Sequence, residues 1–133
     1  MEKKGKTILD YNPEDIFKLD PTKLANLMQE GFSFTIPFNE EDISIHDLSY
    51  MQALIVKAGN AFPYLAYLNS LAKIQVRKAK REKLSKEEIE DAIDRKEVIS
   101  NITESVNMQY NAISRLITVK QQINEELKMT NGR

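Results

Sequence analysis

The stretch "KIQVRKAKREKLSKEE", residues 73–88, decides the fold, because it ends one helix and begins another. Its first fourteen positions hold seven basic residues and one acid, and the chain then becomes acidic. Ser85 and Glu88 have the spacing of a capping box, in which the serine oxygen accepts a hydrogen bond from the glutamate amide. We therefore predict a turn near residue 85 and a new helix after it.

Apolar residues on both sides of this turn recur three or four positions apart, as one face of a helix requires. The series covers residues 45–84 and 86–128, and the second helix would be about 65 Å long. Two rods of similar length joined by a short turn predict an antiparallel helical hairpin with coiled-coil spacing. Gly59 and Pro63 indicate a kink or a short break in the first rod. Whether the charged run at 94–97 breaks the second rod stays open.

The first third of the chain consists of shorter pieces. Asn12 with Pro13, and Asp20 with Pro21, each have the pattern of an N-cap followed by a proline in the first helical turn. Gly31 is placed to close the second of these helices. Two short helices are therefore expected before the hairpin.

The segment "FSFTIPF", residues 32–38, alternates apolar and other residues with the period of a strand, and so predicts one extended piece. The predicted fold class is mainly all-α. It comprises an N-terminal arm over residues 1–43, with short helices and the extended segment, and a helical hairpin over residues 44–129.

Composition indicates one cytoplasmic domain, in the host cytoplasm if the source is viral. The chain has 133 residues, of which 41% are hydrophobic and 29% charged, as in globular proteins. It has no cysteine and no apolar run long enough to cross a membrane, so we expect no thiolate metal site and no membrane partner. The single histidine, His46, indicates a surface or capping side chain. We expect no metal, no cofactor and no catalytic residues, and therefore no enzyme.

The net charge of -1 conceals blocks of opposite sign. One interpretation is that the basic and acidic arms pair across the hairpin, through Lys83–Glu87, Lys80–Glu90, Arg77–Asp94 and Lys73–Glu97. The other is that the bases contact the phosphates of nucleic acid, with Tyr64 and Tyr67 further along the rod near the bound strand. The sequence leaves both open. The candidate nucleic-acid contacts are Lys73, Arg77, Lys78, Lys80, Arg81 and Lys83.

The order of segments also resembles a known family. A basic helix end, "VRKAKREKL", precedes an acidic stretch, "IEDAIDRKEV", and a long helix containing "QYNAISRLITVKQQI". Over residues 60–123 this order resembles the UvsY-type recombination mediators of T4-like phages and other small helical-hairpin phage proteins. Residues 78–81 stand where that family has a basic element, and residues 94–98 where it has an acidic pattern. The resemblance implies single-stranded DNA binding, oligomerisation, and loading of a recombinase onto DNA coated with single-strand binding protein.

Two functions of different classes follow. The first is a non-enzymatic accessory protein that binds single-stranded DNA in phage-type recombination or replication, with a recombinase or single-strand binding protein as a further partner. The alternative is a viral adaptor or inhibitor that uses its acidic N-terminal arm against a host or phage enzyme.

Self-association is expected as well, because a long rod leaves apolar surface uncovered. The residues assigned to an oligomer or partner interface are Phe32, Phe34, Ile36, Phe38, Ile102, Val106, Tyr110, Ile113 and Ile117.

Overall fold

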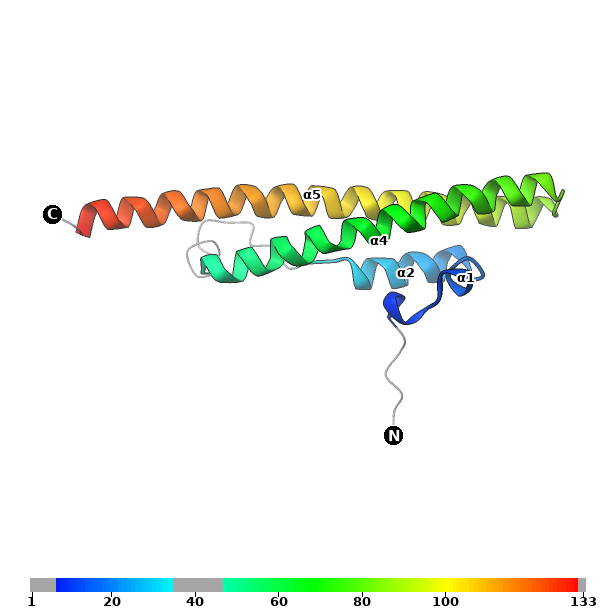
Figure 1. Cartoon of the computed structure of the whole chain (residues 1–133), viewed down its shortest axis with the longest axis horizontal. Coiled ribbons are helices and arrows are strands. Elements are labelled where there is room, and N and C mark those ends of the chain that lie inside the picture. Colours follow the sequence, from blue (N-terminus) through cyan, green and yellow to red (C-terminus); the bar gives the residue numbers. More distant parts are fainter. Residues whose placement is uncertain (1–6, 35–46, 132–133) are drawn as a thin grey trace, which may run out of the picture.

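Two long antiparallel helices form the frame of the molecule (Figure 1). The computed structural model describes residues 7–34 and 47–131, and in these residues the chain forms helices and turns without a strand. Helix α4 spans Leu48–Arg81 and helix α5 spans Lys86–Asn131. The two helices pack against each other from Leu54 of α4 to the turn. The predicted all-α helical hairpin is confirmed.

The turn between the helices occupies residues 82–85 and follows a Schellman motif. Lys83 has a φ of 54°, in the left-handed region. Its amide donates to the carbonyl of Lys80 at 3.2 Å, and the amide of Leu84 donates to the carbonyl of Ala79 at 3.1 Å. These two bonds satisfy carbonyls at the end of α4 and reverse the chain. The hairpin therefore turns where the sequence predicted.

Side-chain oxygens cap the N-termini of both long helices. Ser85 Oγ accepts from the amide of Glu88 at 3.2 Å, as the capping-box spacing predicted. Asp47 Oδ1 accepts from the amide of Tyr50 at 2.7 Å, and α4 begins directly after this cap. The pattern predicted a start near residue 45, which lies outside the described residues. Because α4 has 34 residues and α5 has 46, α5 extends past the start of α4 (Figure 1).

Both long helices are continuous. Pro63 lies inside α4, and no break forms there or at Gly59. A proline in a helix interior removes one hydrogen bond and costs about 3 kcal/mol, but the fully buried Leu65 anchors the helix to α5 just beyond it. The charged run at 94–97 also stays helical, because Ile99 continues the buried series of α5.

Buried residues in the seam between the helices recur every seven positions, a spacing that keeps them on one face of each helix. Alanines fill three of the four positions on α4, so the two backbones can approach closely while branched residues of α5 fill the space. The repeated positions are Ala58, Leu65, Ala72 and Ala79 on α4, and Ala92, Ile99, Val106 and Ile113 on α5.

The N-terminal arm folds back against one side of the hairpin (Figure 1). It contains a short 3-10 helix, η1 (Ile8–Asp10), and two α-helices, α1 (Pro13–Ile16) and α2 (Pro21–Gly31). The two predicted short helices are therefore confirmed, and Asp20 caps the second by accepting from the amide of Thr22 at 3.1 Å. Gly31 ends α2 without a positive φ. Its role is close packing, since a Cβ there would lie 2.7 Å from Cγ2 of Ile8.

The arm and the hairpin complete one core. The sequence predicted a boundary between the arm and the hairpin at residues 43 and 44. The apolar side chains of the two segments nevertheless pack in the same cluster. Fully buried members from the arm are Ile8, Ile16, Leu24 and Met28, and those from the hairpin include Leu65, Leu68, Ile99 and Val106.

Two polar side chains of α5 bind the backbone of the arm. Arg95 Nε donates to the carbonyl of Leu19 at 2.6 Å. Gln109 Nε2 donates to the carbonyl of Phe32 at 3.1 Å, and its Oε1 accepts from the amide of Phe34 at 2.8 Å. Gln109 therefore fixes the beginning of the "FSFTIPF" segment, whose residues 35–38 lie outside the described residues.

Candidate nucleic-acid interface

The two sides of the hairpin differ in what covers them. On the arm side, the ring of Tyr64 lies beside that of Phe32, with centroids 6.1 Å apart. On the other side, Phe62 meets Tyr110 edge to face, with centroids 5.6 Å apart. Tyr64 and Phe62 are about 160° apart around α4 at 3.6 residues per turn. We call the side marked by Phe62 and Tyr110 the open side.

Four of the six predicted phosphate contacts continue this open side toward the tip of the hairpin. Asn69 lies on the open side, about two helical turns after Phe62. Its Nδ2 donates to Thr103 Oγ1 of α5 at 2.7 Å. Three of the cations follow Asn69 in steps of four residues, and all four lie within an arc of about 100°. All four side chains are exposed. We call this set the cationic stripe: Lys73, Arg77, Lys80 and Arg81.

The other two predicted contacts are placed differently. Lys78 lies about 100° from Arg77 around the helix, on the arm side, where it lines a pocket. Lys83 lies in the turn itself. Both are exposed. The structure therefore brings four of the predicted cations together and separates Lys78 and Lys83 from them.

The cross-arm ion pairs do not form within the described residues. No nitrogen–oxygen contact of 4.0 Å or less joins the basic end of α4 to the acids of α5. The reason is rotational: Ala92 and Ile99 face α4, and Asp94 and Glu97, each two residues away from one of them, lie about 160° around the helix. The absent pairs are Lys83–Glu87, Lys80–Glu90, Arg77–Asp94 and Lys73–Glu97.

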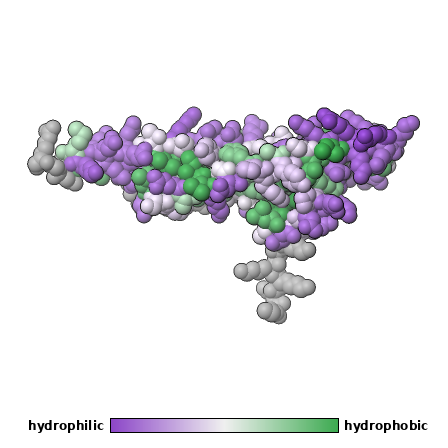
Figure 2. All heavy atoms as spheres, viewed as in Figure 1, coloured by the Kyte–Doolittle hydropathy of each residue, from purple (hydrophilic) through white to green (hydrophobic). Residues whose placement is uncertain are grey.

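Hydrophilic side chains cover most of the surface at the tip of the hairpin. Figure 2 shows hydrophilic residues gathered over the tip of the hairpin, whereas hydrophobic ones lie nearer the middle of the molecule. Because its cations are exposed and have no ion-pair partner in the described part of the chain, the cationic stripe can attract a polyanion without first breaking contacts there.

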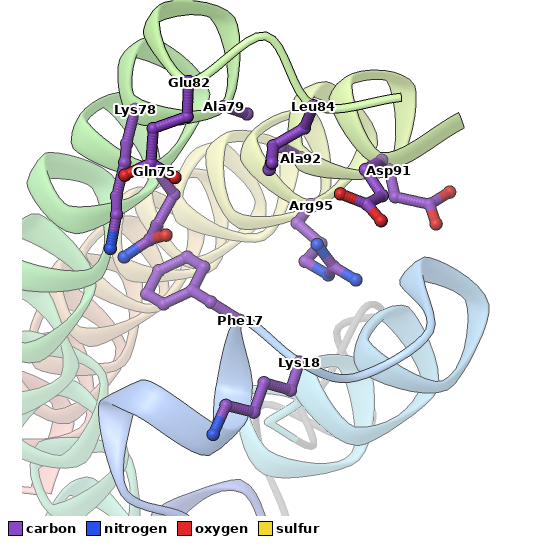
Figure 3. A pocket seen from close by; sticks show the side chains of 11 residues that line it. Phe17, Lys18, Gln75, Lys78, Ala79, Glu82, Leu84, Asp91, Ala92 and Arg95 are labelled. Carbon is purple, nitrogen blue, oxygen red and sulfur yellow. The ribbon is translucent and has the colours of Figure 1, made fainter. Parts of the chain in front are cut away.

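A pocket of about 390 Å³ lies between the arm and the tip, on the side away from the stripe (Figure 3). It mixes cations, acids and apolar side chains, and Phe17 of the arm faces Lys78 across it. Its acids oppose the entry of a phosphate chain, so the stripe is the better candidate for nucleic acid. The lining residues are Phe17, Lys18, Gln75, Lys78, Ala79, Glu82, Leu84, Glu88, Asp91, Ala92 and Arg95.

The predicted interface residues mostly pack inside this chain. Phe32, Val106 and Ile113 are buried, and four others are half-buried: Phe34, Ile102, Tyr110 and Ile117. Ile36 and Phe38 lie outside the described residues. Apolar surface that the prediction did not include remains exposed on α5, at Met108, Leu127 and Met129. A role of the predicted set in an oligomer stays a prediction.

Two further properties concern only the part of the chain that the structure describes. None of its helices is both long and apolar enough to span a membrane. It contains no cluster of three or more histidine and carboxylate side chains that could coordinate a metal ion. His46 lies outside the described residues.

Comparison with known protein families, curated proteins and solved structures finds no match to this chain.

Proposed function

We propose that this protein is a non-enzymatic accessory protein that binds single-stranded DNA through the cationic stripe, in recombination or replication of the phage type. The observation that supports the proposal most is the exposure of Lys73, Arg77, Lys80 and Arg81 on one side of α4 without an ion-pair partner among the described residues. Cations spaced one helical turn apart can follow a phosphate backbone.

The resemblance of residues 60–123 to the UvsY-type mediators supports the choice of single-stranded DNA. In this proposal several copies assemble, and the complex helps to load a recombinase onto DNA coated with single-strand binding protein. The net charge of -1 means that the rest of the protein does not attract DNA. Affinity therefore comes from a few local contacts and weakens strongly with salt.

The alternative, an adaptor acting through the N-terminal arm, has less support. Ile16, Leu24 and Met28 of the arm are fully buried against the hairpin. A partner could not reach these side chains without opening the core. Phe34, near the start of the extended segment, is half-buried, and its amide donates to Gln109 Oε1.

The proposal is tested by fluorescence anisotropy of a labelled single-stranded oligonucleotide titrated with the protein at several salt concentrations. Four phosphate contacts predict a slope of log K against log salt of about -2.8, at about 0.7 per contact on a single strand. In the double variant Lys80→Gln, Arg81→Gln the slope should fall in magnitude by about 1.4.

The matched control is Lys23→Gln, Lys128→Gln, which removes the same charge from exposed positions on α2 and near the end of α5. It should bind like the wild type. Absence of binding by the wild type at low salt would contradict the proposal, and so would an equal loss of affinity in both double variants.

A further inference from the structure

The outward face of α4 carries a second, continuous line of exposed residues. Its members are spaced three and four apart, which keeps them on one face opposite the buried alanines. Tyr67 is 52% exposed and Ile74 is 50% exposed. We call this line the outer stripe: Tyr67, Ser70, Ile74, Arg77 and Arg81, all exposed. It is about 21 Å long at 1.5 Å per residue, and its last two members also belong to the cationic stripe.

The structure separates two tyrosines that the sequence treats alike. Tyr64 lies on the arm side, half-buried beside Phe32, and its hydroxyl is buried. Tyr67 is exposed, and within the described residues it has neither a ring contact nor a hydrogen bond. Only Tyr67 therefore offers an aromatic face to a ligand that approaches along the outer stripe.

We propose that a single strand of DNA runs along the outer stripe, with one base stacked on Tyr67 and the phosphates of nearby nucleotides bound by Arg77 and Arg81. This inference rests on the proposed function. Tyr67 is about 15 Å from Arg77 along the axis, so the stacked base and the bound phosphates belong to nucleotides a few positions apart. Ile74 lies between them and contacts the apolar faces of the intervening bases.

The charges of the outer stripe favour nucleic acid over a protein helix as its ligand. Three- and four-residue spacing would also suit a partner helix, but a helix that covered the whole outer stripe would have to bury Arg77 and Arg81, its last two members. Burying these cations without partners is costly. A nucleic acid strand instead supplies a phosphate to each guanidinium and a flat base to the tyrosine.

The test uses the full-length protein and a labelled oligothymidylate of about 15 nucleotides, within the site sizes usual for single-strand binding. Tyr67→Leu keeps an apolar side chain but removes the ring, and should weaken binding by about 5- to 150-fold. Tyr67→Phe keeps the ring and should bind like the wild type. Neither variant should change the salt slope, because no charge is removed.

An abasic DNA strand of the same length, which has the sugar-phosphate backbone but no bases, separates stacking from other effects of the substitution. On this abasic strand Tyr67→Leu and the wild type should bind equally, because there is no base to stack. Met108→Leu, at a 65% exposed position of α5, is the control for an apolar change away from the stripe and should bind oligothymidylate like the wild type. Circular dichroism should show equal helix content in all variants.

The outcomes distinguish this inference from the proposed function. If Tyr67→Leu binds oligothymidylate like the wild type while Lys80→Gln, Arg81→Gln weakens binding, the inference is overturned and the function stands. An equal loss on the abasic strand, or a change of oligomer mass by light scattering without a change of DNA affinity, also overturns it. If the wild type binds no strand at low salt, both fail.

Discussion

At the scale of single residues, the hairpin depends on a lysine in an unusual backbone conformation. Lys83 has a φ of 54°, which the Schellman motif at the end of α4 requires at this position. A residue with a Cβ pays roughly 1–2 kcal/mol in this region, whereas glycine does not. A lysine here therefore costs stability but adds a positive charge to the tip.

Lys83→Gly should stabilise the protein by about 1 kcal/mol, after allowance for the greater freedom of glycine in the unfolded chain. The measurement is urea unfolding followed by circular dichroism. Lys83→Ala is the control, because it removes the same charge but keeps the Cβ, and it should bring no gain. A gain of equal size in both variants would mean that charge repulsion, and not φ, is responsible.

Tyr64 carries a buried hydroxyl without a hydrogen-bond partner among the described residues. Tyr64→Phe removes this polar atom and should leave stability unchanged or raise it by up to about 1 kcal/mol at neutral pH. A loss of more than that in urea unfolding would mean that the hydroxyl has a partner in solution.

Burial raises the pKa of the Tyr64 hydroxyl above its ordinary value of 10.0. The unfolded chain therefore releases this proton first as pH rises, which favours unfolding above pH 10. The stability of the wild type should fall relative to Tyr64→Phe as pH increases through this range. Parallel pH profiles for the two proteins would contradict the assignment.

At the scale of elements, α5 positions the arm through its polar side chains as well as through its apolar face. The amide group of Gln109 donates to the carbonyl of Phe32 and accepts from the amide of Phe34, as a strand neighbour would. Arg95 binds the carbonyl of Leu19 at the other end of α2. These contacts give the arm its register along the hairpin.

Gln109→Met keeps the length of the side chain but removes both hydrogen bonds to the arm. We expect a loss of about 2 kcal/mol, at about 1 kcal/mol for each neutral bond, and faster hydrogen exchange at the amide of Phe34. Gln122→Met makes the same chemical change at an exposed position of α5 and should have little effect. Unchanged exchange at Phe34 in the Gln109 variant would show that the bond is not formed in solution.

At the scale of the whole molecule, one core joins segments that lie far apart in the sequence. Leu24 of the arm is fully buried in the same cluster as Ile99 and Val106 of α5. The described part of the arm therefore covers one side of the hairpin and leaves the opposite side, with the cationic stripe, open to a ligand.

Leu24→Ala should destabilise the whole protein by about 2–5 kcal/mol, as the removal of a buried leucine side chain usually does. Unfolding should remain a single transition, with the same midpoint by circular dichroism and by tyrosine fluorescence. Leu9→Ala, at a 69% exposed position of the arm, should change stability by less than about 0.5 kcal/mol. Two separate transitions would show that the arm folds independently of the hairpin.

The sequence alone determined the features that depend on neighbours along the chain. Capping residues located the starts of α2 and α5, because their hydrogen bonds join residues two or three positions apart, and the proline in its first turn located α1. Apolar spacing predicted the two rods, since a buried face requires it. The six candidate cations could be chosen from the basic run before the turn.

Only the tertiary structure decided how these features face one another. Whether α4 and α5 pair their charges depends on the rotation of each helix about its axis, which packing of Ala92 and Ile99 sets, and not on distance from the turn. The exposure of Tyr67 and the burial of Tyr64 likewise depend on which side the arm covers. Such choices follow from contacts between residues distant in the sequence, so no local pattern contains them.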